Sequence, residues 1–197
     1  MTHLLLNLLA IALYLAGAAL LWRGLRRPPG GVRPALYGLV PTALLLHGVV
    51  LYQGLVQPAG LNLGLTNALS LVAWAVTALW LLTTLTRPVE TLGVFILPLA
   101  AAFVLAAWIW PAEHVLTVKG APLAAAHIVI SLLAYSLLSI ALVQGLMLAL
   151  QERGLRGRPR RGLLDALPPL ETMELLMFQM IAVGFLLLTL TLVSGVF

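Results

Sequence analysis

The chain alternates between long apolar runs and short polar connections. Six runs lack Lys and Arg, and each approaches the ~20 apolar residues that a membrane-spanning helix needs. Their apolar residues are continuous rather than alternating, which favours helices over the strands of a membrane β-barrel. The pattern predicts an all-α, polytopic transmembrane helix bundle that forms a single integral membrane domain. Its helices are expected at 4–22, 36–55, 65–85, 91–110, 123–150 and 173–197.

Composition supports this interpretation and excludes several classes of function. Hydrophobic residues make up 62% of the 197 positions and charged residues 9%, whereas soluble domains carry about 25% charged residues. The net charge of +5 does not indicate nucleic-acid binding, because the basic residues lie in short connections without interleaved aromatic residues. The chain has no Cys and no hydrolase or nucleotide-binding motif, so we expect no enzymatic activity.

The basic residues also predict the orientation in the membrane. The first, third and fifth connections carry ten Arg between them, whereas the second and fourth carry only Lys119. Cytoplasmic loops are enriched in Lys and Arg. An even number of helices with both termini on the external, periplasmic side places the three Arg-containing connections in the cytoplasm and the other two outside. The first run has its charges after it rather than before it, unlike a signal peptide, so we expect it to be retained as a helix.

This orientation places all four histidines toward the external side. His3 and His114 lie outside the apolar runs, where solvation is enough to explain them. His47 is expected about 12 Å from the external end of the second helix, and His127 about 6 Å inside the fifth. Ionisable groups at such depths have two interpretations. They are either neutral side chains bonded to a neighbouring helix, or a ligand or proton-handling site.

Other polar and aromatic positions have structural explanations. Ser131 and Tyr135 follow His127 at helical spacing, so this face is expected to look into the bundle. Met173, Met177 and Met180 share a helical spacing that favours packing over a metal site. Four tryptophans lie mostly near the ends of apolar runs, where an interfacial aromatic belt explains them: Trp74, Trp80, Trp108 and Trp110.

Three segments resemble the cytochrome c assembly (CcsA/CcmC-like) membrane protein family. Residues 67–74 (NALSLVAW) are similar to the helix that begins its core region, and residues 127–135 (HIVISLLAY) to its external histidine with the following Ala-Tyr step. Residues 170–195 are similar to its segment with Gly-Phe, Leu-Leu-Thr and Ser-Gly. Their order and spacing agree over most of the chain from Asn67 onward. The Arg-rich loop, the Pro-Pro-Leu and Met-Phe patterns and His47 are closest to the YpjD branch.

The resemblance implies haem handling at the external face of a bacterial inner membrane, in support of cytochrome c biogenesis. The matching motif implies that His127 is an axial ligand of the haem iron. His47 matches the closer branch and is a further cofactor-binding candidate. The family's Trp-rich element is absent, and Gln179 stands where relatives often have Arg. Relatives of this branch generally continue through two further helices, so we expect the chain to be short at its C-terminus.

Three functions remain open at this point. The first is a haem-binding or haem-presenting assembly factor whose partners are the lipid bilayer, haem and other cytochrome assembly proteins. The second is a transport or envelope-stress accessory protein that keeps the fold without haem. The third is a b-type electron-transfer subunit, which usually needs paired histidines on facing helices; His47 and His127 are the one intramembrane pair that the chain offers.

Overall fold

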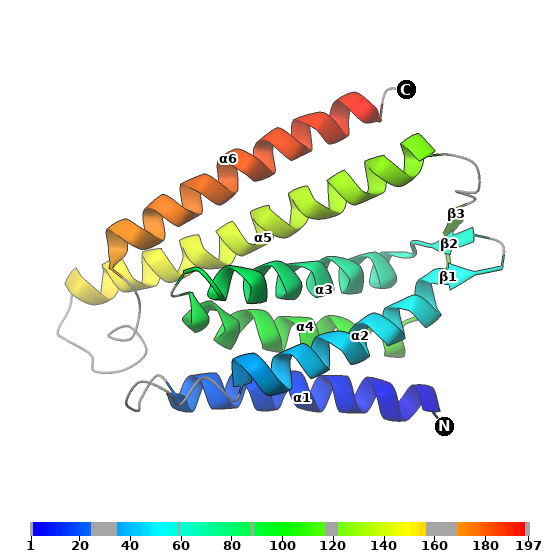
Figure 1. Cartoon of the computed structure of the whole chain (residues 1–197), viewed down its shortest axis with the longest axis horizontal. Coiled ribbons are helices and arrows are strands. Elements are labelled where there is room, and N and C mark those ends of the chain that lie inside the picture. Colours follow the sequence, from blue (N-terminus) through cyan, green and yellow to red (C-terminus); the bar gives the residue numbers. More distant parts are fainter. Residues whose placement is uncertain are drawn as a thin grey trace.

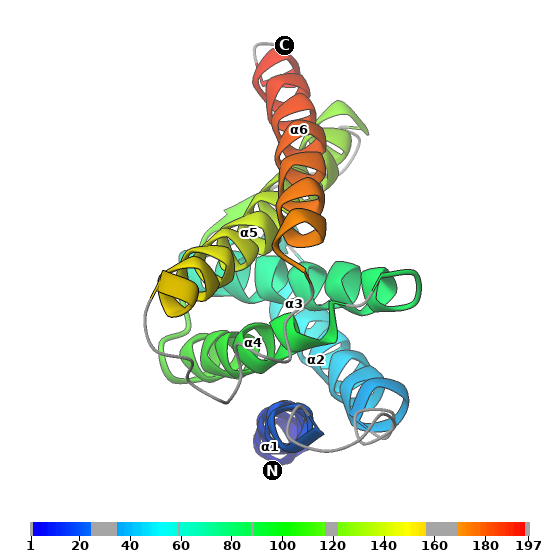
Figure 2. The ribbon, with the colours of Figure 1, turned by 90° about the vertical axis from the view of Figure 1, so that its left-hand side faces the viewer.

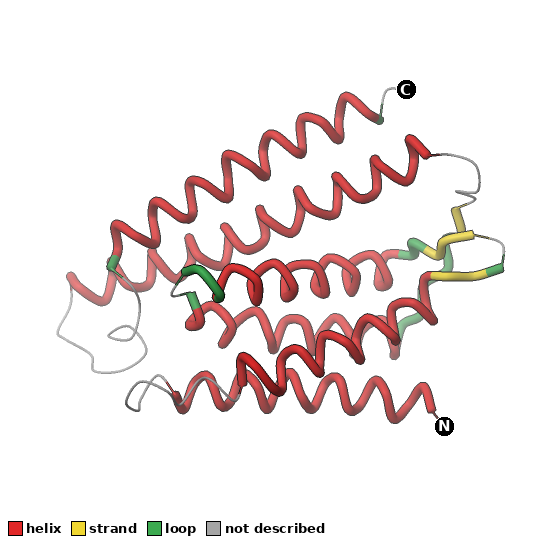
Figure 3. Tube along the Cα trace, viewed as in Figure 1, coloured by secondary structure: helices red, strands yellow, loops and turns green. Residues whose placement is uncertain are grey.

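The six predicted membrane helices are present. The computed structural model describes residues 2–24, 35–58, 60–87, 89–116, 122–156 and 169–195. Six helices within these ranges are long and apolar enough to cross a membrane, which confirms the predicted fold class (Figures 1 and 3). They are α1 (Thr2–Gly24), α2 (Val40–Leu55), α3 (Leu65–Thr84), α4 (Gly93–Ile109), α5 (Pro122–Arg156) and α6 (Leu170–Ser194). A π-helical turn, η1 (Ala35–Leu39), precedes α2, and a 3-10 turn, η2 (Glu90–Leu92), precedes α4.

The helices form two packing groups. Helices α1 to α4 pack together, and α5 joins them mainly through α3, whereas α6 packs almost entirely on α5. Figure 2 shows α6 standing at the edge of the molecule, farthest from α1. Because most of α6 faces outward, large apolar side chains such as Phe178, Phe185 and Leu192 are exposed on it. In a bilayer these side chains contact lipid, where their exposure carries no hydrophobic cost.

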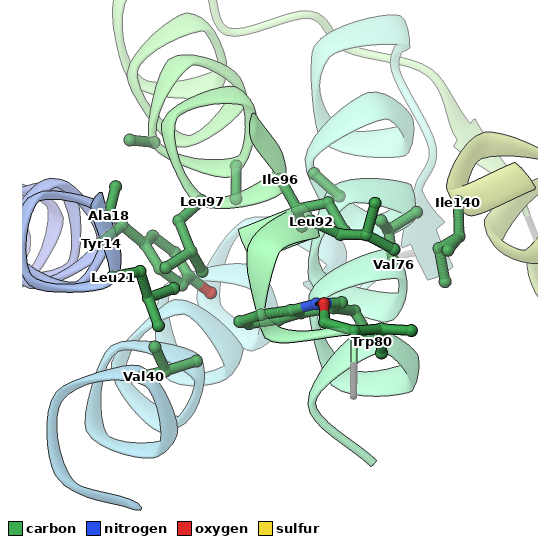
Figure 4. Close-up of a cluster of buried hydrophobic side chains, with 14 of the residues drawn as sticks. Tyr14, Ala18, Leu21, Val40, Val76, Trp80, Leu92, Ile96, Leu97 and Ile140 are labelled. Carbon is green, nitrogen blue, oxygen red and sulfur yellow. Dashed lines mark hydrogen bonds between the residues drawn. The ribbon is translucent and has the colours of Figure 1, made fainter. Parts of the chain in front are cut away.

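The core lies mainly between α1, α2, α3 and α4 and extends to buried residues of α5 and α6; Figure 4 shows part of it. Its largest side chain is Trp80, which has no exposed surface and donates from Nε1 to the carbonyl of Val89 at 2.9 Å. The expectation that Trp80 belongs to an interfacial belt was therefore wrong. A buried indole needs a partner for its N–H, and the turn before η2 supplies one. Met173 is buried in the same core and Met180 packs against it, in agreement with the packing interpretation.

A small antiparallel sheet, which the apolar pattern did not predict, joins two connections at one end of the bundle. Strands β1 (Val56–Gln57), β2 (Gly60–Asn62) and β3 (Val115–Leu116) pair in that order. The sheet ties the α2–α3 connection to the segment after α4. The start of α1, the start of α5 and the end of α6 lie at the same end (Figure 1).

Most of the basic residues behind the predicted orientation lie outside the described residues. Among them are Lys119 and the Arg residues at 26, 27, 33, 158, 160 and 161. The assignment of the β-sheet end of the bundle to the external side therefore stays a prediction.

Candidate functional site: two histidine centres

The first centre surrounds His47, which lies on α2 and has no exposed surface. Its Nδ1 is 3.0 Å from the hydroxyl of Tyr14 on α1, and its Nε2 is 2.9 Å from Oγ of Ser70 on α3. The rings of Tyr14 and His47 meet edge to face, with an interplanar angle of 84°. Both nitrogens therefore have a partner on a different neighbouring helix.

This network extends beyond the imidazole. Thr77 is a further hydrogen-bonding neighbour of the Tyr14 hydroxyl, and Thr77 Oγ1 donates to the carbonyl of Ala73 at 2.8 Å. A buried polar group without a partner costs several kcal/mol in a hydrocarbon environment. Since the ring nitrogens and the hydroxyls around them are paired, the network is compatible with a neutral His47. The structural interpretation of this histidine therefore has direct geometric support.

The second centre surrounds His127, which lies near the start of α5 and is half-buried. Its Nδ1 is 2.9 Å from Oγ of Ser194 at the end of α6. Gly195 follows directly, and a Cβ placed there would come within 3.3 Å of Cε1 of His127. The close approach of α6 to the imidazole ring therefore suits a residue without a side chain at this position.

The hydrogen bonds around Ser194 indicate which tautomer His127 adopts. Ser194 Oγ also donates to the carbonyl of Thr191 at 3.0 Å. A serine hydroxyl has one proton, so both contacts form together only when Ser194 accepts a hydrogen bond from Nδ1–H. Nε2 then carries the lone pair, and it makes no hydrogen bond to any residue within the described ranges. A neutral imidazole with one nitrogen anchored and the other free has the donor arrangement that haem iron requires of an axial histidine.

Two further hydroxyls support the same interface between α5 and α6. Ser131 Oγ donates to the carbonyl of His127 at 2.7 Å and lies 3.5 Å from Oγ1 of Thr191. The predicted polar face was wrong at Tyr135, which is 51% exposed. Eight residues at 3.6 per turn place Tyr135 about 80° around the helix from His127, enough to move it off the α6 contact.

The structure does not bring the four histidines together. His47 lies at the meeting of α1, α2 and α3, whereas His127 lies between α5 and α6. His114 and His3 are exposed, as expected for solvated positions. Within the ranges that the structure describes, no group of three or more His, Cys, Asp or Glu side chains is placed to hold a metal ion.

Sequence reasoning did not identify Asn62 and Tyr14 as important. Asn62 is buried, and its Oδ1 accepts from the backbone N–H groups of Gly64 and His114, at 3.1 and 2.9 Å. It therefore links the end of β2 to the exposed His114, which directly precedes β3. Tyr14 offered a usable signal, because a tyrosine in the middle of an apolar run is too far from the interface for an aromatic belt and needs a partner.

Comparison with known proteins agrees with the resemblance inferred from the three segments. A family model described as cytochrome C assembly protein matches residues 36–197. Relatives named inner membrane protein YpjD, from Escherichia coli strains K12, O6:H1 and O157:H7, are each 32% identical over 197 residues. The match covers 96% of this chain and 73% of each relative. No solved structure matches the chain at a significant level.

These relatives and the six apolar helices confirm a multi-pass protein of the bacterial inner membrane, whose helices contact the lipid bilayer. Membership of this family also supports a role in cytochrome c biogenesis, a kind of function that is not itself enzymatic. The chain belongs to the cytochrome c assembly protein family, in its YpjD branch.

Proposed function

We propose that this protein binds haem at the external face of the inner membrane and presents it for cytochrome c-type biogenesis, without catalysing a reaction itself. His127 is the proposed axial ligand of the haem iron. The observation that carries the proposal is the anchored imidazole: Ser194 holds Nδ1 at 2.9 Å and leaves Nε2 without a protein partner among the described residues.

The residues around His127 fit this role in distinct ways. Ser194 fixes the tautomer and the ring orientation, since it accepts from Nδ1–H while donating to Thr191. Hydrogen bonds of this kind raise the basicity of a ligating histidine and limit its rotation. Gly195 leaves room for the ring edge. When bound, haem would supply an iron that accepts an imidazole nitrogen as a ligand.

His47 as a second cofactor-binding residue stays a prediction. For His47 to contact iron, one of its nitrogens must give up its bond to Tyr14 or Ser70, and the ring must reach out of a site with no exposed surface. A buried hydroxyl left without its partner costs about 1–3 kcal/mol. Single-histidine ligation by His127 therefore needs less rearrangement of this structure than ligation by both histidines.

An accessory membrane protein that keeps the fold without haem is the second candidate. The fully paired network of His47 favours it, because that network explains an intramembrane histidine through helix packing alone. The two candidates differ in one measurable property, which is whether the purified protein carries a haem absorbance.

The test is the visible spectrum of the protein purified from cells with ample haem. We expect a Soret band in the wild type and the loss of most of it in His127→Ala, because this change removes the proposed ligand. His47→Ala should lose less haem or only shift the band. His114→Ala should have little effect, because its side chain is exposed.

Each variant is compared at equal abundance in the membrane, since misfolding would also remove haem. A wild-type protein without Soret absorbance would exclude the haem proposal for this chain and leave the accessory role. Equal haem content in His127→Ala and wild type would exclude His127 as the ligand.

A further inference from the structure

A groove between α3, α5 and α6 opens at the end of the bundle opposite to the β-sheet. Its volume is about 400 Å³. Apolar side chains from three helices line its inner part, among them Leu79 of α3, Leu137 of α5 and Val183 of α6. This part of the groove follows α6 toward the middle of the membrane. Its dimensions and composition suit a hydrocarbon chain rather than a water-soluble molecule.

The rim of the groove has a different chemistry. Arg87 lies in the turn after α3, and Thr86 and Gln179 line the groove with it. The side chains of Arg87, Thr86 and Gln179 are all exposed. The groove has no acidic lining residue in the part of the chain that the structure describes. The Thr86 hydroxyl already donates to the carbonyl of Thr83 at 3.3 Å, so the rim offers a phosphate oxygen the guanidinium of Arg87 and the carboxamide of Gln179 as hydrogen-bond donors.

We propose that this groove is a binding site for an anionic phospholipid. The guanidinium of Arg87 pairs with the phosphate, and the carboxamide of Gln179 donates to a headgroup oxygen. One acyl chain lies along the apolar side chains of α3, α5 and α6. The charge of the rim selects an anionic over a zwitterionic headgroup, as basic pockets between membrane helices do elsewhere. Because α6 otherwise packs almost entirely on α5, the lipid also bridges α6 to α3.

A second groove provides a comparison within the same protein. It lies between α4 and α5, has a volume of about 440 Å³ and contains Phe95, Leu99 and Met147. Among the residues that the structure describes, Arg153 is its one polar lining residue. An isolated Arg beside an apolar groove attracts any anionic lipid at the membrane surface, but it offers no further donor that fixes a headgroup. Arg153 is therefore the matched control for Arg87.

The experiment is native mass spectrometry of the full chain in detergent, titrated with phosphatidylglycerol or with phosphatidylcholine of the same acyl chains. We expect one saturable phosphatidylglycerol adduct and weaker binding of phosphatidylcholine. Arg87→Gln should weaken phosphatidylglycerol binding by more than about fivefold, which is the factor expected for one basic residue near a lipid surface alone. Val183→Trp should weaken it through the acyl part of the groove, and because Val183 is exposed to lipid, the larger side chain does not disturb the core.

The control Arg153→Gln should weaken phosphatidylglycerol binding by about fivefold at most, the part due to surface attraction alone. Equal loss in Arg87→Gln and Arg153→Gln would show general surface attraction and would overturn the site. Equal affinity for the two lipids, or wild-type binding in Val183→Trp, would also overturn it. The last measurement is competition of phosphatidylglycerol binding by glycerol phosphate. Effective competition by this soluble headgroup would show that the acyl groove contributes nothing.

Discussion

The hydroxyl of Tyr14 lies 3.0 Å from Nδ1 of His47, and the two rings meet edge to face with centroids 5.7 Å apart. Tyr14 belongs to α1 and His47 to α2, and Ser70 on α3 completes the contact on the other side of the imidazole. Three helices are thus joined through one side chain. In lipid, where no hydrophobic driving force holds the helices together, such a contact acts with close packing to specify which faces meet.

Loss of the hydrogen bonds of His47 should reduce stability in proportion to the number of bonds removed. Hydrogen bonds between membrane helices contribute about 0.6 kcal/mol on average, so Tyr14→Phe and Ser70→Ala should each lower the free energy of unfolding by about that amount. His47→Ala removes both bonds and leaves a cavity, and should cost about 2 kcal/mol or more. Unfolding of the purified protein in mixed micelles measures these differences.

Thr42→Ala is the matched control for this series. Thr42 lies on the same helix and donates to Gly38 at 2.9 Å, but it does so at the surface and within its own helix turn. A cost for Thr42→Ala equal to that of Tyr14→Phe would show that the contact between helices contributes nothing specific.

Ser194→Ala should weaken haem binding without removing the proposed ligand. The change removes the acceptor for Nδ1–H of His127, so the imidazole is free to rotate and to change tautomer. Changes to such supporting hydrogen bonds typically cost about 10- to 100-fold in metal affinity. Haem titration of the purified protein should therefore show weaker binding and a shifted Soret band.

Thr189→Ala on the same helix is the control, because its hydroxyl is exposed and bonds only to the carbonyl of Phe185 at 2.9 Å. If Ser194→Ala binds haem like the wild type while His127→Ala does not, His127 is the ligand but Ser194 does not position it.

Gly93→Ala should destabilise the core between α1, α3 and α4. A Cβ at Gly93 would overlap the indole of Trp80 and the side chain of Leu21. Trp80 is fully buried and held by Val89, so it has little room to move. Overpacking of this kind costs about 1–3 kcal/mol, and the melting temperature in detergent should fall accordingly. Gly38→Ala is the control, since a Cβ there meets no atom within 4 Å, and an equal loss would contradict the packing argument.

The membrane helices were predictable because each is a continuous apolar run. The predicted spans and the observed helices agree to within a few residues at most ends, and α5 is longer than predicted because it continues to Arg156. The sheet was not predictable, since strands of two and three residues are too short to show an alternating pattern. Trp80 was misplaced because its position near the end of a run does not reveal that the turn before η2 covers it.

The candidate site was predictable only in part. His127 could be singled out from the sequence, but its partner Ser194 is 67 residues away, and helix spacing says nothing about which helix faces another. The same limit applies to Tyr14, which is 33 residues from His47. Contacts between helices depend on their rotation and tilt, and these are set by packing over the whole bundle.

The predicted orientation can be tested with single cysteines, because the chain has none of its own. His114→Cys and Thr86→Cys change exposed side chains at opposite ends of the bundle, and they leave the Lys and Arg residues that direct orientation unaltered. In intact cells, we expect an impermeant maleimide to label His114→Cys and not Thr86→Cys. Permeabilised cells should show labelling at both positions, which controls for reactivity. The reverse pattern in intact cells would place the β-sheet and the end of α6 in the cytoplasm, and with them His127 and the proposed haem site.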